Sequence, residues 1–465
     1  MADAQAKFLT GNLFRHVSVM SLTSSVGLMA IFLVDFVDMI FIAMLGKAEL
    51  AAAVGYAATI LFFTTSFGIG MSIAAGALVA RALGSGDSQL AEERKTHSLI
   101  YGFVFGLIFA VVIWLNLAFL VSLLGAQAEI ADLAVGYLQI IVPTLPFLML
   151  GMMGGAILRA HGDARRAMMA TIYGGAVNAV LDPILIFGLG LDLTGAALAS
   201  VAARLVIAYA ALVPIARHYG GVGRPRAAGM LRDIVPIATI AVPAILTQLA
   251  TPVGQAIVTR AMADYGEAAI AGMAIVGRLS MVAFGIVFAL SGAVGPILGQ
   301  NYGAGNSERV RDGFLAAVYF NGMVVFVVSA LLFLLRAPIA DLFSATGITR
   351  ELVFLFCGPL SLLFFFNGVL FIANAAFNNM GYPFYSTFLN WGRNTVGMVP
   401  LVLLGAGLLG AEGVLIGQAL AGVIFGGLGW VFARRVMREA PGVLPATGSE
   451  FGRQGRLMAL LHLRR

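Results

Sequence analysis

Charge and cysteine are both scarce in this sequence. Only 11% of its 465 residues are charged, whereas soluble domains carry roughly 25%. The shortage of charge excludes a large soluble domain. Cys357 is the single cysteine, which excludes an intrachain disulfide or a cysteine metal cluster. The first residues also lack the short apolar core and small-residue cleavage site of a signal peptide, so we expect the first hydrophobic stretch to be retained.

Long apolar runs dominate the sequence. Hydrophobic residues make up 60% of the chain, and the runs are separated by short polar loops. Each run is long enough for the ~20 residues that a helix needs to cross a bilayer. The sequence therefore predicts an all-α integral membrane protein with twelve transmembrane helices, near residues 17–45, 50–80, 97–123, 130–158, 167–189, 194–216, 234–262, 268–299, 312–335, 350–378, 384–408 and 412–436.

The net charge of +6 raises the question of nucleic-acid binding. Most of the 28 Lys and Arg residues, however, lie in alternate loops between the apolar runs. Such a bias is typical of loops on the cytoplasmic side of a membrane protein. The sequence thus predicts a multi-pass protein of the cell (inner) membrane with both termini in the cytoplasm. We expect contacts with membrane lipids and no nucleic-acid partner.

The two halves of the chain resemble each other. "SIAAGALVARALGSGDS" (72–88) matches "SGAVGPILGQNYGAGNS" (291–307) with six identities in 17 positions, and Gly162 falls on Gly381 at the same separation of 219 residues. A repeat of six helices returns the chain to its starting side and predicts two six-helix bundles related by pseudo-two-fold symmetry along the membrane normal. The predicted regions are an N-terminal lobe (1–216), a linker (217–233), a C-terminal lobe (234–437) and a basic cytoplasmic tail (438–465).

Three carboxylates lie inside apolar runs of the first half. Charged residues at bilayer depth cost ~2.5–3.5 kcal/mol each on insertion scales, so they indicate functional sites. Asp35 and Asp38 lie three residues apart on one predicted helix. Asn178 and Asp182 lie four apart on another, followed by Pro183, which predicts a bend. These oxygens suit a hard cation or a proton. The second half offers amides and aromatic residues instead.

Several of these segments resemble a known family. "VDMIFIAMLGKAELAAAVG", "GALVARALGSGD", "LRAHGDARRAMMATIYGGAVNAVLDPILIFGLGLDLTGAALAS" and "GPILGQNYGAGN" are similar to the multidrug and toxic compound extrusion (MATE) family, and the acids confined to the first half resemble its DinF-type branch. The resemblance implies ion coupling at Asp38, Asn178 and Asp182, with Ser200 and Tyr137 beside them and Asp35 as a further candidate. The set Asp38, Asn178 and Asp182 would bind a metal ion only if sodium is the coupling ion.

The family implies export of small organic compounds, cationic or amphipathic, in exchange for H+ or Na+ by alternating access. We expect no cofactor, no enzymatic activity and a monomer. Two rivals stay open. A flippase for a lipid-linked precursor would need a cationic cavity, for which only Arg204 and Arg278 are candidates within the spans. An intramembrane aspartyl hydrolase could use two acids to activate water, but the Gly-x-Gly-Asp signature is absent and the repeat would be unexplained.

Two further expectations concern single positions. Many members of the family have a proline in the first helix, where this chain has Thr23, and the repeat aligns Thr23 with Pro243 of the second half. We therefore expect no large kink in the first helix. The five histidines fall in termini or predicted loops, and we expect them at the surface.

Overall fold

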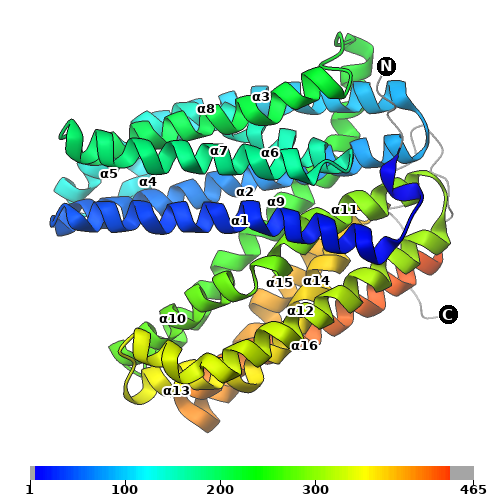
Figure 1. The fold of residues 1–465 in the computed structure, drawn as a ribbon. Coiled ribbons are helices and arrows are strands. Elements are labelled where there is room, and N and C mark those ends of the chain that lie inside the picture. Colours follow the sequence, from blue (N-terminus) through cyan, green and yellow to red (C-terminus); the bar gives the residue numbers. More distant parts are fainter. Residues whose placement is uncertain (1–5, 440–465) are drawn as a thin grey trace.

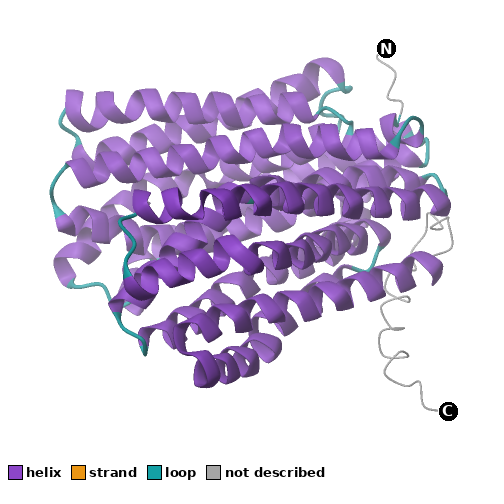
Figure 2. Cartoon of the chain, turned by 60° about the horizontal axis from the view of Figure 1, so that its bottom comes forward, coloured by secondary structure: helices purple, strands orange, loops and turns teal. Residues whose placement is uncertain are grey.

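The computed structural model describes residues 6–439, without the side chains of Ala48, Ala128 and Glu439. The first five residues and all but the first two residues of the predicted tail therefore lie outside the described residues. Almost all of the described chain is helical, joined by short loops (Figure 2). Apolar side chains also cover much of the outer surface, as expected for a protein that contacts lipid.

The first six spans form the N lobe. They comprise α1 (Leu13–Met44), α2 (Ala48–Gly84), α3 (Ser88–Leu115) with α4 (Leu117–Leu123), α5 (Ala128–Ile141) with η2 (Val142–Thr144) and α6 (Leu145–Ala160), α7 (Ala164–Pro183) with η3 (Ile184–Gly188), and α8 (Asp192–His218). A short 3-10 helix, η1 (Lys7–Leu9), precedes them.

The next six spans form the C lobe. They comprise α9 (Ala227–Ala263), α10 (Glu267–Ala283) with α11 (Gly285–Gly303), α12 (Ser307–Leu342), α13 (Gly347–Leu355) with η4 (Phe356–Leu360) and α14 (Ser361–Met380), α15 (Pro383–Gly392) with η5 (Arg393–Gly397) and the first part of α16 (Met398–Glu439), and the rest of α16.

Twelve crossings follow from the lengths and breaks of these helices. Ten helical segments in the described chain are long and apolar enough to span a membrane, and α10 with α11, bent by 48°, makes an eleventh. The last of the ten, Pro383–Arg438, contains a reversal at Gly410, whose φ is 62° and ψ is −139°. A Cβ at Gly405 would lie 2.1 Å from the carbonyl oxygen of Gly413, so the two arms of this hairpin are in backbone contact. The hairpin supplies the twelfth span and confirms the predicted fold class.

The connection between the lobes is shorter than predicted. We expected a linker over residues 217–233, but α8 continues to His218 and α9 begins at Ala227. The segment 227–233 contains good helix formers and extends α9 beyond the apolar run that defined the prediction. Only Tyr219–Arg226 is not helical.

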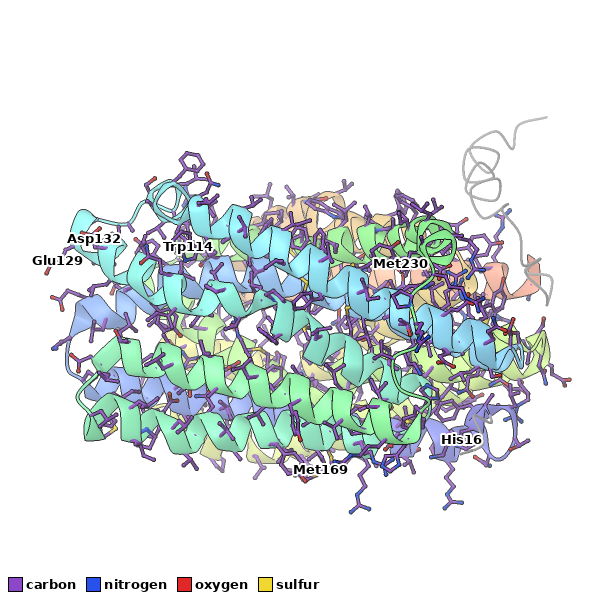
Figure 3. All side chains as sticks on the ribbon, turned by 90° about the horizontal axis from the view of Figure 1, so that it is seen from above. His16, Trp114, Glu129, Asp132, Met169 and Met230 are labelled. Carbon is purple, nitrogen blue, oxygen red and sulfur yellow. The ribbon has the colours of Figure 1, made fainter. Side chains whose placement is uncertain are left out.

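The two lobes converge at one end of the molecule and diverge toward the other (Figure 1). We call the converging end, which holds η1, the α6–α7 turn and the end of α16, the closed end. Viewed from above, Trp114, Glu129 and Asp132 lie at the opposite end, whereas His16 and Met230 lie toward the closed end (Figure 3). The N lobe contacts the C lobe mainly through α1 and α2 against α9 and α11.

The repeated segments meet each other at the closed end. A Cβ at Gly84 would lie 1.9 Å from the carbonyl oxygen of Gln300, and one at Gly303 would lie 2.1 Å from that of Arg81. Because Arg81 and Gln300 are 219 residues apart, as are Gly84 and Gly303, these contacts are reciprocal. Reciprocal contact is the signature of a two-fold interface. Only glycine permits backbones to approach this closely.

Hydrogen bonds follow the same reciprocal pattern. Arg81 donates from Nε to the carbonyl of Asn379 (2.7 Å) and from Nη2 to that of Asn378 (2.7 Å). Gln300 donates from Nε2 to the carbonyl of Ala160 (2.8 Å). Since Ala160 corresponds to Asn379 in the repeat, each lobe sends one side chain to the same helix end of the other. We call the side chains of Arg81 and Gln300 with these carbonyls the clasp.

The η1 segment adds to the clasp. Phe8 is 1% exposed, its N–H donates to Oε1 of Gln300 (2.8 Å), and its carbonyl accepts from Nδ2 of Asn301 (3.1 Å). Lys7 donates to the carbonyl of Gly162 in the N lobe (3.0 Å). The segment before α1 therefore contacts both lobes at the point where they meet.

A buried ion cluster also joins the lobes, and it corrects our expectation for one histidine. We expected His97 at the surface, but its side chain is 1% exposed and Nδ1 lies 2.6 Å from Oδ2 of Asp233, which is fully buried in α9. Arg94 and Arg232 lie 3.4 Å and 3.1 Å from the other carboxylate oxygen. The first turns of α9 bring Asp233 to α3, which the sequence alone did not indicate.

Candidate functional site

Three of the predicted site residues form one hydrogen-bonded cluster. Nδ2 of Asn178 donates to Oδ1 of Asp38 (3.1 Å) and to Oδ2 of Asp182 (2.7 Å). The two carboxylates also lie within hydrogen-bonding reach of each other. Asp182 is fully buried, Asn178 is buried and Asp38 is partly buried. The cluster thus joins α1 to α7 inside the N lobe.

The local sequence explains why α7 can present this pair. Asn178 and Asp182 are four residues apart and share a helix face. α7 ends at Pro183 and a π-helical turn (Ile184–Gly188) follows, so the regular α-helix changes directly after Asp182, where we predicted a bend. Gly175 lets α1 approach, since a Cβ there would lie 2.9 Å from Val34 Cγ2. Close packing of small residues is typical of helices in membranes.

One carboxylate oxygen has no partner. Among the described residues, Oδ1 of Asp182 is buried and makes no hydrogen bond. A buried acceptor without a partner costs about 1–3 kcal/mol, more if it is charged. Such exceptions require an explanation, and a visiting ion or proton is one. A purely structural bridge between α1 and α7 would not leave this buried oxygen without a partner.

Tyr137 and Ser200 lie together beside the acids. The phenol of Tyr137, from α5, hydrogen-bonds the hydroxyl of Ser200, from α8, and both Asp38 and Asp182 lie close enough to act on it electrostatically. Arg204, one turn after Ser200, donates from Nη1 to the carbonyl of Ile141 (3.2 Å) and to Oγ1 of Thr144 (3.1 Å). This arginine is therefore satisfied by neutral oxygens and does not neutralise the carboxylates.

Asp35 is not part of the cluster. Its side chain is exposed in the described chain, and no hydrogen bond or ion pair of a described residue involves it. It lies one turn before Asp38 and close enough to act on it through its charge. Asp35 can therefore tune Asp38 electrostatically without sharing its hydrogen bonds.

The cluster offers few ligands to a metal ion. Within residues 6–439, no group of three or more His, Cys, Asp or Glu side chains could hold a metal. The amide of Asn178 also turns its N–H2 group, not its oxygen, toward both carboxylates. A sodium ion prefers oxygen ligands, as other hard cations do, so the amide would have to rotate before Asn178 could serve as a ligand. A proton shared between the two carboxyl groups requires no such change.

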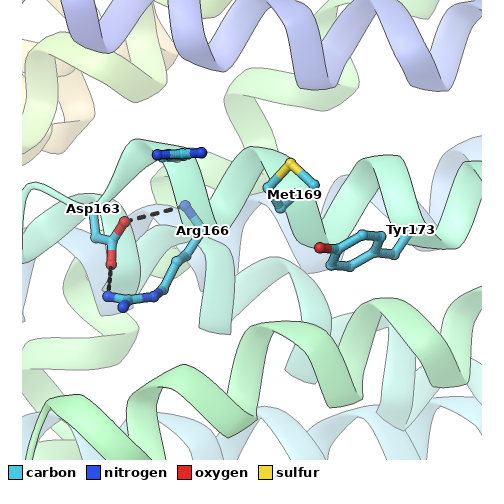
Figure 4. A pocket seen from close by; sticks show the side chains of 5 residues that line it. Asp163, Arg166, Met169 and Tyr173 are labelled. Atoms are coloured by element: carbon cyan, nitrogen blue, oxygen red, sulfur yellow. Dashed lines mark hydrogen bonds and ion pairs between the residues drawn. The ribbon is translucent and has the colours of Figure 1, made fainter.

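Surface pockets occur at the closed end, far from the acids along α7. One is lined by Asp163, Arg165, Arg166, Met169 and Tyr173 (Figure 4). Another lies beside η1 and is lined in part by Lys7, His161 and Tyr219. Neither pocket includes a predicted site residue.

The turn between α6 and α7 contributes two titratable groups, His161 and Asp163, to these pockets. Burial raises the pKa of Asp163, but hydrogen bonds from Tyr219 (2.8 Å) and Arg166 (2.6 Å) outweigh it and keep the pKa below its usual range. Burial, with a smaller contribution from nearby Lys95, lowers the pKa of His161 to about 4. His161 is therefore neutral at physiological pH, and its ring stacks on Tyr219 at 4.4 Å.

Sequence analysis found the acid cluster but missed the clasp. The repeat alignment had already placed Arg81 opposite Gln300, and that was the only available signal. Their hydrogen-bond acceptors are backbone carbonyls, which no residue type reveals.

Comparison with known proteins shows the family to which the chain belongs. The sequence model of the MatE family matches residues 24–184 and 243–421, which is most of both lobes. The chain belongs to the MatE family. Its members are multidrug and toxic compound efflux transporters and not enzymes, so this is a multi-pass membrane transporter. Each matched range lies within one of the two predicted lobes.

Curated relatives cover nearly the whole chain. The FAD transporter of Shewanella oneidensis is 29% identical over 430 residues, which is 90% of this chain and 93% of that protein. The multidrug export protein MepA of Staphylococcus haemolyticus is 24% identical over 88% of this chain and 90% of its own length.

Solved structures share the fold. A MATE structure described as the straight conformation covers 94% of this chain with a TM-score of 0.87 at 23% identity, and it is covered over 99% of its length. A transporter from Pyrococcus furiosus, described as having a binding pocket of reverse polarity, gives a TM-score of 0.87 at 22% identity, with 94% and 99% coverage. These similarities support the twelve-helix, two-lobe architecture.

Proposed function

We propose that this transporter is a secondary active antiporter that exports organic compounds in exchange for protons or sodium ions. Alternating access between the two lobes would carry the substrate. The observation that carries the proposal is the cluster of Asp38, Asn178 and Asp182 with its unpartnered carboxylate oxygen. Family membership supports efflux, and the cluster supports the coupling.

The physics of the cluster favours reversible cation binding. Two carboxylates within hydrogen-bonding reach repel each other when both are ionised. A cation between them removes the repulsion, and its release restores it. The amide orientation described above supports a proton over sodium as that cation. Tyr137 and Ser200 supply neighbouring hydroxyl groups, whereas the neutral partners of Arg204 leave the acids free to bind.

The distribution of basic residues supports an orientation. The closed end carries the Arg-rich turns, including Arg165 and Arg166 at the start of α7 and Arg232 near the start of α9. By the positive-inside rule this end belongs in the cytoplasm. The described form would then be sealed on the cytoplasmic side, with both termini there, in the cell (inner) membrane.

Substrate charge is a separate question. The family resemblance predicts cationic or amphipathic substrates. One relative is named for FAD, and flavin nucleotides carry phosphate groups. We therefore propose export of organic compounds as the function that is common to both kinds of substrate.

Transport in proteoliposomes tests the coupling. We expect an imposed proton gradient to drive substrate movement by the purified protein, with a sodium gradient as the parallel arm. Asp38→Asn and Asp182→Asn each replace one ionisable carboxyl group with a neutral amide. Because ionisable groups in membranes act as ion relays, each variant should lower gradient-driven transport by about 100-fold. Asp192→Asn is the matched control, because Asp192 pairs with Lys47 at the exposed start of α8.

The experiment distinguishes a loss of ion coupling from a loss of folded protein. Both variants should elute as monodisperse protein, since an amide can replace each carboxylate in the hydrogen bond to Asn178. Gradient-driven transport at wild-type rates in both variants would rule out the acid cluster as the coupling site. Movement that is equally fast without any gradient would rule out antiport.

A further inference from the structure

Arg159 occupies the boundary between the lobes. It lies one residue before the end of α6, and its neighbours Leu158 and Ala160 are fully buried. Its guanidinium extends back along the helix, because a Cβ at Gly155 would lie 3.4 Å from Nη1. It also reaches the opposite lobe, since a Cβ at Gly292 of α11 would lie 3.8 Å from Nε.

The residues that face this guanidinium across the lobe boundary are exposed. Apart from Arg159 and the surrounding backbone of α11, no atom lies within 4 Å of a Cβ placed at Gly292, and Gly292 and Ser291 are exposed. Arg159 itself is partly exposed. On the same face of α6, one and two turns earlier, Gly155 and the partly exposed Met152 lie in line with it. One face of α6 points toward the C lobe. Arg159 lies on this face, at the end nearest the closed end.

Arg159 has no partner among the described residues. Within residues 6–439, no hydrogen bond, ion pair or ring contact involves its side chain. Two other arginines at the closed end are engaged: Arg81 by carbonyls and Arg232 by Glu93 and Asp233. An uncompensated charge within a membrane span marks a substrate or ion pathway.

The coupling acids are too distant to neutralise Arg159. Asp182 lies eighteen residues after Ala164, the first residue of α7, which is about 27 Å along the helix. Arg159 and Ala164 flank the same short turn at the closed end. One arginine side chain cannot span that distance. The N lobe therefore holds a negative site toward one end and a separate positive group between the lobes.

We propose that Arg159 is a substrate-binding residue and that this transporter exports organic anions whose phosphate or carboxylate group binds its guanidinium. The planar guanidinium matches such groups with two parallel hydrogen bonds. This inference deepens the proposed antiport and rests on it for the direction of transport. The acids would carry the coupling cation, and Arg159 would select the charge of the substrate.

Matched probe pairs test the charge selection. Riboflavin and riboflavin 5′-phosphate differ by one phosphate, as do adenosine and adenosine monophosphate. We expect the purified full chain to bind and transport each phosphorylated compound better than its neutral parent. Arg159→Gln should raise KM and the equilibrium Kd for the phosphorylated probes on the order of 10- to 100-fold, the loss of one or two charge-assisted hydrogen bonds. Arg159→Lys should restore part of this, and the neutral probes should change little.

Arg165→Gln is the control, because it removes an exposed arginine from the same end of the N lobe. Equal losses for charged and neutral probes in Arg159→Gln would show a purely structural or gating role and overturn the proposal. So would equal binding of phosphorylated and neutral probes by the wild type. If binding prefers the phosphate but no gradient drives transport, the antiport proposal fails and the anion contact stands.

A second arm identifies the source of the anion. Liposomes containing a trace of fluorescently labelled phosphatidic acid report lipid movement through quenching of the outer leaflet. Arg159-dependent movement of this lipid, without any preference for the soluble phosphates, would assign the anion to a lipid headgroup. Arg159-dependent transport of the soluble phosphates alone supports export of soluble anions.

Discussion

The two lobes have the same geometry where they touch and different chemistry where they bind. At the closed end, Arg81 of the N lobe and Gln300 of the C lobe occupy equivalent positions and reach equivalent carbonyls. Gly84 and Gly303 make equivalent backbone contacts. The comparison teaches that a backbone interface preserves the repeat even after its side chains have diverged from cation to amide.

Away from the interface the lobes differ in their buried polar residues. At a separation of 220 residues, Asp38 corresponds to Val258, which is fully buried in apolar surroundings. The C lobe instead contains an amide network in which Asn390 donates to Asn374 (3.2 Å) and Asn394 donates to the carbonyl of Asn390 (2.9 Å). Amides satisfy one another without holding charge, so this network offers no carboxylate to the coupling cation proposed above.

The largest effect should come from filling the glycine contacts. Gly84→Ala and Gly303→Ala each place a Cβ about an ångström or more inside contact distance of a backbone carbonyl, so the closed end cannot stay as it is. Overpacking of this kind costs about 3 kcal/mol. Because the contacts are reciprocal, both variants should separate the lobes by similar amounts.

Spin-label distances between Gln89 and Glu308 measure this separation. Both residues are exposed and equivalent in the repeat, and Cys357→Ser removes the native thiol. Gly55→Ala is the control, since a Cβ there meets nothing within 4 Å. Unchanged distances in both variants would show that the lobes meet differently from the described form.

A smaller effect should distinguish the two side chains of the clasp. Arg81→Gln removes two charge-assisted hydrogen bonds, which contribute about 1.5–3 kcal/mol each, whereas Gln300→Ala removes neutral ones of about 1 kcal/mol. We expect a larger fall in Tm for Arg81→Gln than for Gln300→Ala. Arg217→Gln, at an exposed position of α8, should leave Tm unchanged. Equal shifts for Arg81→Gln and Gln300→Ala would mean that charge adds nothing to the contact.

The smallest effect concerns His161, whose counterpart in the repeat is Met380. Burial lowers the folded-state pKa of His161 to about 4, below the ~6.5 of an unfolded histidine. The unfolded state therefore binds the extra proton first as pH falls. The contribution to stability is complete above pH ~6.5 and declines toward pH 4, by about 1–2 kcal/mol at pH 5.

His161→Met removes this dependence and makes the turn resemble its C-lobe equivalent. Between pH 7.5 and 5, the Tm of the wild type should fall more than that of the variant. Parallel Tm curves for the two proteins would contradict the buried, neutral state of His161.

The sequence was sufficient to predict features that depend on composition and periodicity. Apolar runs gave the twelve spans, and the gap between predicted helices 384–408 and 412–436 contains the reversal at Gly410. Carboxylates within apolar runs indicated the cluster, because an acid at bilayer depth is rare. Thr23 stands where a proline was expected from the family, and α1 continues from Leu13 to Met44.

Features that depend on distant partners were not predictable. We expected His97 at the surface, because nothing near it in the sequence indicates a partner. Asp233 is 136 residues away and is brought to His97 only by the packing of α9 on α3. The clasp was hidden for a different reason, since carbonyl acceptors carry no sequence signal. Arg159 was invisible because its environment depends on Gly292 in the opposite lobe.

The uninterrupted course of α1 has a mechanical consequence. From Leu13, beside the contacts of η1, to Asp38 the helix rises about 38 Å without a proline, a common cause of sharp kinks. Under the coupling proposed above, ion binding at one end would move α1 by tilt or rotation as a single rod. Its displacement at Asp38 would then reach the segment where the two halves of the transporter are joined.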